Sequence, residues 1–416
     1  MAQKLTHEVV IVGGGASGIA TASSMLKRRP GLDIAIVEPN DHHDYQPGWT
    51  MVGGGIFAAP STRHSMASVM PRQVRWLRHA AVSFQPEDNQ VTLADGTTVN
   101  YQILVVAAGI RLAWEKIEGL EDTLGKNGVT SNYRYDTAPY TWELVQKLNT
   151  GRAVFSQPPI PIKCAGAPQK AMYLSCDAWR RRGVLRDIDV EFRNAGAVLF
   201  GVKDYVPALM EYIGKYGINL KLGQTLVAVD GPAKEAIFKT EAGEETVAFD
   251  MLHVVPPQVA PQFVADSPLA NPESGFVDID KFTLRHVRYP NIFGLGDAGS
   301  TPNAKTAAAA RKQAPIVAVN ALAALDGRAP VAEYDGYGSC PLTVERGKIV
   351  LAEFGYDGKL LHSFPNWLID GTKPRRLSWL LKSKALPWVY WNGMLKGHEW
   401  MVAPKQIPDS PVHKAA

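Results

Sequence analysis

The first forty residues contain a glycine pattern that restricts the fold more than any other feature of the chain. A buried strand is predicted over residues 8–12, followed by a turn and a helix that ends near Arg29. The turn reads G-x-G-x-x-G, with its glycines at Gly13, Gly15 and Gly18. In this motif the first glycine permits the turn, the second lets the backbone approach a pyrophosphate, and the third lets the helix pack on the strand. The pattern predicts a Rossmann-like domain.

A Rossmann-like domain that binds a dinucleotide typically has an acidic residue at the end of its second strand, and this chain has Glu38 at that position. Glu38 follows the apolar run "IAIV" at the spacing typical of a carboxylate that accepts hydrogen bonds from ribose hydroxyls. Strand, glycine turn, helix and acid together predict an adenine dinucleotide bound near the N-terminus.

Two later segments are similar to segments of the glutathione-reductase-like flavoproteins, which have two dinucleotide-binding domains. In those proteins, the matching segments complete the FAD-binding domain. One is a buried strand that ends at Ala108 and Gly109 after a predicted hairpin, and the other ends at Gly296 and Asp297. A helix is predicted to begin near Thr306. In that group, the acid matching Asp297 binds the ribityl chain, and the following helix directs its N-terminus at the flavin.

An inserted region, about residues 121–274, has strand and helix signals of its own. In NADH-using relatives of this architecture, the inserted domain repeats the glycine fingerprint after its first strand. Here the loop over residues 158–168 reads "PPIPIKCAGAP", in which Gly166 is the one glycine. Prolines lack the backbone N–H donors that a pyrophosphate needs. Binding of a nicotinamide cofactor is therefore disfavoured.

Composition excludes several classes of protein. The net charge of +4 over 416 residues is too small to indicate nucleic-acid binding, and no apolar run reaches the roughly 18 residues of a membrane span. The first predicted strand begins near Glu8, so no leader peptide is expected, and we expect the protein to stay inside the cell. The three cysteines form no CxxC pair and no zinc spacing. No metal site is expected, and the adjacent His42 and His43 are expected in a flavin-domain loop.

The C-terminal region, from about Val331, combines tryptophans, leucines and basic residues. It is predicted to begin with a hairpin over residues 348–364, and residues 367–416 hold five of the ten tryptophans. Leu377 and Leu380 share a helical face, with basic residues such as Lys382 nearby. This combination suits a membrane interface. The alternative is a helix that docks on its own domain or on a partner subunit.

Two of the three cysteines have sequence surroundings that favour reactivity. Cys164 follows Lys163 at the start of a predicted helix, and both a cation and a helix N-terminus favour the thiolate. Cys340 is predicted in a turn-rich loop, "YDGYGSCPL". Either cysteine taken alone would more often be a small buried hydrophobic residue than a nucleophile, and the loop surroundings favour the nucleophile. Cys176 is expected to be structural.

Several motifs resemble the sulfide:quinone oxidoreductase family, in particular its mitochondrial-type members. They include "PIKCAGAPQKAMYLS", "YPNIFGLGDAGSTPNAKTAAA", "YDGYGSCPL" and "YWNGMLKG", and the similarity extends over essentially the whole chain. The resemblance implies a flavoenzyme that oxidises hydrogen sulfide to sulfane sulfur, as persulfide or polysulfide, and passes two electrons to a membrane quinone of the ubiquinone type. Cys164 and Cys340 match the two redox cysteines, with Cys340 nearer the flavin.

The resemblance also implies the course of the reaction. Hydrosulfide would attack a disulfide or a sulfur-bridged pair and leave a persulfide on Cys164. A small acceptor, such as a thiol, sulfite or cyanide, would then remove the sulfane sulfur. Some bacterial members carry a third essential cysteine upstream, and this variant is excluded because no cysteine precedes Cys164.

The complete expectation is an α/β chain with two Rossmann-like domains and a C-terminal membrane-associating region. The FAD-binding domain is assigned to residues 1–120 and 275–330, the second Rossmann-like domain to 121–274, and the quinone-facing and membrane-facing region to 331–416. FAD contacts are expected at Gly13, Gly15, Ala16, Ser17, Gly18, Glu38, Pro39, Gln46, Ala108, Gly109, Gly296, Asp297, Lys305 and Thr306. Quinone contacts are expected at Tyr390 and Lys396.

Two other functions share parts of this pattern. A type II NADH:quinone oxidoreductase has the same architecture but needs a second glycine fingerprint. A flavin-bound redox sensor would keep the cysteines without turnover. We expect the protein to be a peripheral membrane protein at the cytoplasmic face of the inner membrane, and a homo-oligomer is allowed.

Overall fold

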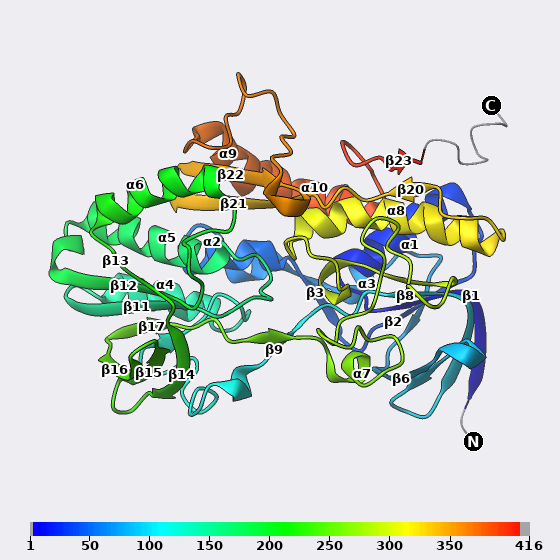
Figure 1. The fold of residues 1–416 in the computed structure, drawn as a ribbon, viewed down its shortest axis with the longest axis horizontal. Helices are drawn as coiled ribbons and strands as arrows, with labels where there is room; N and C mark the ends of the chain where they lie inside the picture. Colours follow the sequence, from blue (N-terminus) through cyan, green and yellow to red (C-terminus); the bar gives the residue numbers. More distant parts are fainter. Residues whose placement is uncertain (1–2, 408–416) are drawn as a thin grey trace.

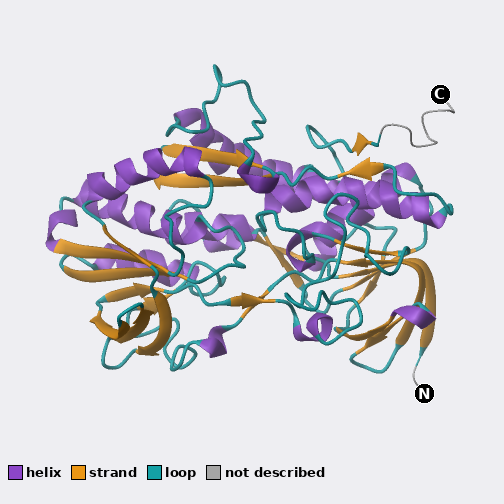
Figure 2. Ribbon diagram, in the orientation of Figure 1, coloured by secondary structure: helices purple, strands orange, loops and turns teal. Residues whose placement is uncertain are grey.

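Two β-sheets lie at opposite ends of an elongated α/β molecule (Figure 1). The computed structural model describes residues 3–407 of the chain. Helices and strands alternate along most of the sequence, and the helices cover the sheets (Figure 2). The predicted α/β class is confirmed. The proposed division into domains at residues 120, 274 and 330 stays a prediction.

The first sheet contains the predicted N-terminal strand at its centre. Its order is β5-β2-β1-β8-β7-β6, and β19 pairs in parallel with β8. Residues 9–12 of β1 are almost completely buried, as expected of a parallel strand covered on both faces. The strands are β1 (Lys4–Val12), β2 (Ile34–Val37), β5 (Arg75–Leu77), β6 (Ala81–Gln85), β7 (Gln90–Leu93), β8 (Thr98–Val106) and β19 (Ile292–Gly294).

Two helices cover this sheet next to the glycine turn. α1 (Ala16–Arg28) starts directly after the turn, and α8 (Ala307–Leu325) packs against it. The small residues of both helices are largely buried, which allows their backbones to approach closely. The start of each helix therefore lies near the carboxyl end of a central strand, where dinucleotides bind in such folds.

The second sheet is entirely parallel, with the order β10-β17-β11-β12-β13. Its helices, α4, α5 and α6, connect or cover these strands, and a separate antiparallel sheet, β14-β15-β16, packs beside it. The elements are β10 (Val129–Thr130), α4 (Ala138–Lys147), β11 (Gly151–Gln157), α5 (Ala167–Arg182), β12 (Ile188–Asn194), α6 (Val206–Tyr216), β13 (Asn219–Leu222), β14 (Thr225–Asp230), β15 (Glu235–Thr240), β16 (Gly243–Ala248) and β17 (Met251–His253).

The C-terminal hairpin differs from the prediction. β22 (Lys348–Phe354) pairs along its length with the preceding β21 (Gly338–Glu345), and only Phe354 bridges to a following residue, Leu360. Most of the predicted hairpin over 348–364 is therefore wrong, and only its centre forms. Cys340 consequently lies in a β-strand opposite Ala352 and not in a loop. The physical reason is the alternation of Cys340, Leu342 and Val344, which are buried because β21 packs on α5.

The remaining C-terminal elements lie along one long side of the molecule, at the top of Figure 1. They are β20 (Ala332–Glu333), α9 (Arg376–Leu380), the π-helical turn η9 (Leu381–Ala385), α10 (Leu386–Asn392), η10 (Met394–Lys396) and β23 (Lys405–Gln406). Short elements elsewhere are β3 (His42–Asp44), α2 (Trp49–Gly53), β4 (Arg63–Ser65), α3 (Met66–Val69), β9 (Arg111–Leu112), β18 (Gln258–Val259) and α7 (Gln262–Ala265). Within residues 3–407, none of the helices has both the length and the apolar character to cross a bilayer.

Candidate active site

The glycine turn after β1 is shaped for close approach to a dinucleotide. Gly13 has a φ of +108°, and a Cβ there would lie 2.4 Å from the carbonyl oxygen of Ala107. A Cβ at Gly18 would lie 1.9 Å from the carbonyl oxygen of Gly13, so α1 packs directly on the turn. A Cβ at Gly15, in contrast, would meet no atom within 4 Å. The first N–H groups of α1 therefore face open space, as a pyrophosphate site requires.

Glu38 lies beside this turn. Its side chain is buried, and its Oε2 accepts a hydrogen bond from the backbone N–H of Gly14 at 2.8 Å. Its Oε1 accepts from the backbone N–H of Asn40 at 2.8 Å. The carboxylate is thus fixed at the end of β2, next to the open position at Gly15, while the ribose contact stays a prediction.

The segment after β19 converges on the same turn. A Cβ at Gly296 would lie 2.2 Å from Oγ of Ser17, in the first turn of α1. Lys305 Nζ donates to the carbonyl oxygen of Asp297 at 2.9 Å, and Thr306 caps α8 by accepting from a helix N–H at 3.1 Å. Burial raises the pKa of the Asp297 carboxyl and lowers that of Lys305 to about 8. The combination of an open glycine turn, a half-buried acid and a capped helix start fits an FAD.

The other residues predicted to contact FAD lie around these segments. Gly109 has a φ of +74° and open space at its Cβ position, and Ala108 beside it is half-buried. Pro39 is exposed after Glu38. Gln46 Oε1 accepts from Lys163 Nζ at 2.6 Å, which links the first domain to the loop that carries Cys164.

The two cysteines singled out in the sequence meet in space. Cys164 Sγ lies 3.4 Å from Cys340 Sγ, although 176 residues separate them. Packing of α5 on β21 brings them together. The backbone N–H of Cys164 donates to the carbonyl oxygen of Lys305 at 2.8 Å. The sulfur pair therefore lies directly beside a segment that is predicted to hold FAD.

The loop before α5 is shaped by the sulfur pair and not by a phosphate. A Cβ at Gly166 would lie 2.2 Å from Leu342 Cδ2 and 2.6 Å from Cys340 Sγ, so a glycine there lets the loop pack closely against β21, the strand that carries Cys340. Cys164 has a φ of +49°, a left-handed conformation that is uncommon outside glycine and occurs often at functional sites. The Tyr133 hydroxyl donates to the carbonyl oxygen of Lys163 at 2.9 Å and fixes the loop.

Lys170, in the first turn of α5, contacts both sulfurs. Its Nζ lies 3.1 Å from Cys164 Sγ and 3.8 Å from Cys340 Sγ. The side chain is 2% exposed. A buried ammonium group needs an anionic partner, and the only groups in hydrogen-bond contact with it among the described residues are these two sulfurs. The site is therefore built to hold sulfur as an anion.

The pKa values of the pair follow from this arrangement. The hydrogen bond from Cys340 and the nearby Lys170 ammonium hold the pKa of Cys164 well below its ordinary value, although burial opposes them. The same hydrogen bond, together with burial, raises the pKa of Cys340. Burial opposes a charge on Lys170, yet attraction to both sulfurs raises its pKa overall. The dithiol pair thus shares one proton, and the negative charge lies mainly on Cys164, the sulfur nearer to Lys170.

Two buried lysines of this site were not predicted from the sequence. Lys170 could have been found, because a lysine in the first turn of a helix opposes the helix dipole and needs compensation. Lys382 was assigned to the membrane-facing basic residues, but it is 3% exposed, so this assignment is wrong. The π-helical turn η9 directs it inward, and its Nζ donates to the carbonyl oxygen of Pro47 at 2.9 Å.

Other candidate residues have different surroundings. Cys176 is completely buried, and burial raises the pKa of its thiol. His43 donates from Nδ1 to the carbonyl oxygen of Gly14 at 3.2 Å, so its Nε2 accepts from the Tyr390 hydroxyl at 2.6 Å. Tyr390 is thereby tied to the glycine turn, whereas Lys396 is exposed. Contact of either residue with quinone stays a prediction.

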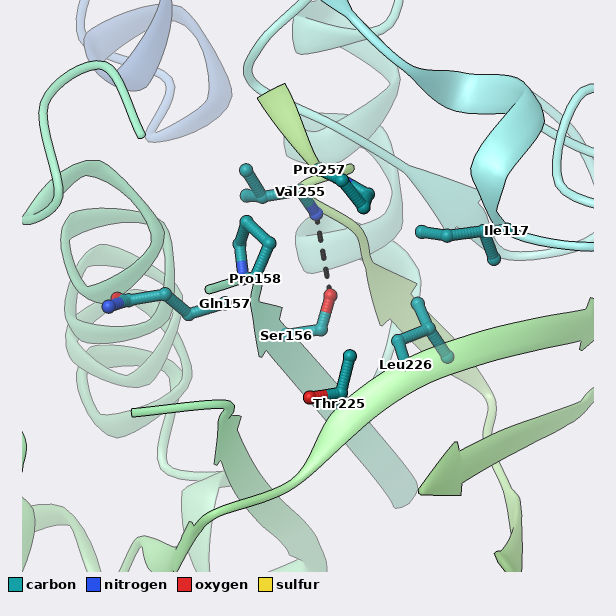
Figure 3. Close-up of a pocket in the computed structure, with 8 residues that line it drawn as sticks. All are labelled: Ile117, Ser156, Gln157, Pro158, Thr225, Leu226, Val255 and Pro257. Atoms are coloured by element: carbon teal, nitrogen blue, oxygen red, sulfur yellow. Dashed lines mark hydrogen bonds between the residues drawn. The ribbon is translucent and has the colours of Figure 1, made fainter. Parts of the chain in front are cut away.

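A small cavity lies at the end of β11. Figure 3 shows the small cavity at this point, where the Ser156 hydroxyl accepts from the backbone N–H of Val255 at 3.4 Å. The cavity measures about 10 Å³, enough for at most one water molecule. Its lining residues are Ile117, Ser156, Gln157, Pro158, Thr225, Leu226, Val255 and Pro257.

The fold and this site define a flavoprotein of the disulphide-oxidoreductase class. Residues 7–143 match the family model described as pyridine nucleotide-disulphide oxidoreductase. The chain is 43% identical to the mitochondrial sulfide:quinone oxidoreductase of Dictyostelium discoideum, over 95% of this chain and 87% of that protein. It is 38% identical to the mitochondrial sulfide:quinone oxidoreductase of Mus musculus, over 94% and 87% of the two chains. The chain belongs to the sulfide:quinone oxidoreductase family, whose members are FAD-dependent flavoproteins.

The fold is similar to that of a sulfide:quinone oxidoreductase whose structure has been solved. The crystal structure of the sulfide:quinone oxidoreductase from Aquifex aeolicus superposes with a TM-score of 0.79 at 20% identity, and the match covers 99% of this chain and 98% of that one. The similarity therefore extends through both sheets and the C-terminal region.

Proposed function

We propose that this chain oxidises hydrogen sulfide to sulfane sulfur at the Cys164 and Cys340 pair and passes two electrons through FAD to a membrane quinone. The observation that carries the proposal is the sulfur pair itself, with a 3.4 Å separation, a buried lysine beside it and a direct backbone link to Lys305. Family membership supports the same reaction.

The contacts among Cys164, Cys340 and Lys170 indicate which sulfur is attacked and which sulfur leaves. Hydrosulfide attacks Cys164 Sγ of the oxidised pair, the bond to Cys340 breaks, and its electron pair stays on Cys340 Sγ. Lys170 stabilises the anionic sulfurs that result. FAD, when bound, would supply a two-electron acceptor for the sulfur pair and a two-electron donor for quinone. Gly15, Glu38, Asp297 and Thr306 are the residues that would hold it.

The same spacing accommodates an intervening sulfur atom. Two S–S bonds of about 2.05 Å that meet at one bridging sulfur place the outer sulfurs about 3.3 Å apart. Cys164 and Cys340 lie 3.4 Å apart, so a sulfur-bridged pair fits without movement of either backbone segment. A small nucleophile such as a thiol, sulfite or cyanide would remove this sulfur, and the lysines around the pair favour acceptors that react as anions.

The two alternative functions are less well supported. A type II NADH:quinone oxidoreductase needs a phosphate-binding loop after β11, but the prolines there lack N–H donors, and Gly166 instead allows the approach of Cys340. A flavin-bound redox sensor would not require a buried lysine that stabilises an anionic sulfur product. A homo-oligomer stays a prediction.

Anaerobic titration of the purified yellow protein separates sulfide oxidation from NADH oxidation. Sulfide is expected to bleach the flavin absorbance within the mixing time, and decylubiquinone is expected to restore it. NADH at the same concentration is expected to leave the flavin oxidised. Bleaching by NADH and not by sulfide would reverse the assignment.

We further propose that α9, α10 and the segments around them contact a membrane. Exposed apolar residues gather in this part of the chain: Trp367, Leu368, Leu377, Leu380, Trp388, Trp400 and Met401. Basic residues, including Arg375 and Arg376, are exposed beside them. Tryptophan, leucine and cationic side chains on short helices suit the lipid headgroup region. The side of the membrane, for which we expect the cytoplasmic face of the inner membrane, stays a prediction.

Charge substitution tests this contact. Replacing both Leu380 and Trp388 with glutamate is expected to lower binding to anionic lipid vesicles by about 100-fold or more, because each side chain contributes roughly 1.5–3 kcal/mol on burial. Co-sedimentation with vesicles measures the change. Val287→Glu, at an equally exposed apolar position in the first domain, is the matched control and should bind as the unmodified protein does. Equal loss of binding in the control would place the contact elsewhere.

A further inference from the structure

His43 is a buried histidine that connects the glycine turn to the C-terminal region. Its side chain is 3% exposed, and its two ring nitrogens have different partners. Nδ1 lies 3.2 Å from the carbonyl oxygen of Gly14, and Nε2 lies 2.6 Å from the hydroxyl oxygen of Tyr390. Tyr390 lies in α10, 347 residues later in the chain, and is also buried. A chain of two hydrogen bonds therefore runs from α10 to the turn after β1.

The two partners determine which ring nitrogen of His43 carries the proton. A carbonyl oxygen can only accept, so Nδ1 is the N–H donor to Gly14. Burial lowers the pKa of His43 to about 4, so the ring is neutral at pH 7 and has a single N–H. Nε2 is then an acceptor, and the Tyr390 hydroxyl donates to it. Tyr390 thus favours the tautomer of His43 that can donate to the Gly14 carbonyl.

The carbonyl that His43 contacts belongs to the peptide group between Gly14 and Gly15. This peptide is trans and planar, so its C=O and N–H point in opposite directions, and a donor that fixes the carbonyl also fixes the N–H. Among residues 3–407, no acceptor forms a hydrogen bond with the Gly15 N–H, whereas the Gly14 N–H is bound by Glu38. The hydrogen bond from His43 therefore sets the direction of an unpaired N–H in the turn that is assigned to FAD.

We propose that His43 and Tyr390 are positioning residues for FAD, which orient the Gly14–Gly15 peptide group so that the Gly15 N–H is available to the pyrophosphate. The inference goes beyond the sulfide reaction and rests on the assignment of FAD to the glycine turn. A donor that is oriented before the ligand arrives strengthens binding, because less ordering remains to be done when the ligand binds. Part of the affinity for FAD is thus supplied by the C-terminal region.

Ring contacts hold α10 in the position that this role requires. The rings of Tyr45 and Tyr390 have centroids 4.7 Å apart, and Trp391 stacks on His64 with centroids 3.9 Å apart. His64 lies in β4, which pairs directly with β3, the strand that carries His43. The packing fixes α10 relative to β3, so the Tyr390 hydroxyl stays within hydrogen-bond distance of the imidazole ring.

Substitutions of His43 that each keep one donor position test the proposal. An asparagine amide can donate from near the position of Nδ1, and a glutamine amide from near that of Nε2. His43→Asn is expected to keep the Kd for FAD within about threefold of the original. His43→Gln and His43→Leu are expected to raise it about tenfold or more, because the Gly14 carbonyl loses its donor. Ultrafiltration of the holoprotein over a series of dilutions separates free from bound FAD and gives the Kd.

Removal of a single hydroxyl tests the contact with α10. Tyr390→Phe is expected to raise the Kd for FAD about threefold to tenfold, because Nε2 of His43 is left without a donor. Tyr45→Phe is the matched control, since it removes a hydroxyl from the adjacent ring that does not contact His43, and it should keep the original Kd. In nitrogen NMR spectra of isotope-labelled histidine, His43 should carry its proton on Nδ1, and its Nε2 signal should move in Tyr390→Phe only.

Equal Kd values for His43→Asn and His43→Gln, or a proton on Nε2 of His43, would overturn the proposal. Gly15→Val tests the assignment on which it rests. The added side chain enters open space, so the protein should fold, but it should block the approach of FAD and abolish binding. Retention of FAD by Gly15→Val would show that the turn is not the FAD site. These measurements contain no sulfide, so a failure of the proposed sulfide reaction would leave them unchanged.

Discussion

Replacement of Cys340 with serine is expected to lower sulfide-dependent quinone reduction by at least about 1000-fold. The reason is that Cys340 Sγ, 3.4 Å from Cys164 Sγ, is the leaving group when hydrosulfide attacks and the sulfur that retains the electron pair. A serine oxygen cannot form the oxidised pair. Steady-state reduction of decylubiquinone by sulfide measures the loss, and the flavin spectrum should stay unchanged because Cys340 does not shape the glycine turn.

The third cysteine provides the control for this experiment. Cys176→Ala removes a thiol that is completely buried in the core of the second sheet. It is expected to cost about 1–2 kcal/mol of stability through a small cavity, and to leave turnover within a factor of about two. More than a tenth of the original activity in Cys340→Ser, or loss of activity in Cys176→Ala, would contradict the assignment of the redox pair.

Replacement of Lys170 with methionine is expected to raise the pKa of Cys164. A nearby positive charge stabilises the thiolate, so its removal favours the thiol. In the unmodified protein, the rate at which the reduced pair reacts with iodoacetamide should stay high to a lower pH than for an ordinary thiol, because the hydrogen bond from Cys340 and the Lys170 ammonium hold the pKa of Cys164 well below its ordinary value. In the variant, the rate should fall as pH decreases through a higher midpoint, and sulfide oxidation at pH 7 should fall about tenfold or more.

The direction of the shift separates a charge effect from a packing effect. Lys170→Arg keeps the charge and should retain a low midpoint for alkylation, whereas Lys170→Met has a similar length without charge. An unchanged alkylation midpoint in Lys170→Met would show that the hydrogen bond from Cys340 alone lowers the pKa of Cys164.

Much of the fold could be predicted because its signals are local. The glycine turn, Glu38 and the strand before them lie within forty residues, and their backbone conformation and spacing follow from nucleotide-binding geometry. The start of α5 beside Cys164 could also be predicted from the sequence, because the prolines that precede it are incompatible with a helix. The meeting of Cys164 with Cys340 was implied by family resemblance, whereas the packing that produces it, α5 on β21, was not visible in the sequence.

The errors have a common physical cause. Cys340 was placed in a loop because of the surrounding glycines and proline, but pairing of β21 with β22 overrides these local preferences. Lys382 was counted with the surface cations because neighbouring leucines and basic residues suggest a membrane face, yet the π-helical turn rotates it inward. Burial of single polar side chains depends on tertiary packing, which local patterns do not encode.

Non-reducing peptide mapping after one equivalent of sulfide tests the central claim most directly. The oxidised enzyme is treated anaerobically without an acceptor, alkylated and digested. We predict one additional sulfur atom on the peptide that contains Cys164. It is expected as a bridge to the Cys340 peptide where the flavin is reduced, in equal molar amount, because closing that bridge releases the two electrons, and as a persulfide where the flavin is still oxidised. Flavin bleaching without any gain of sulfur at Cys164, or with the extra sulfur on Cys176, would contradict the account.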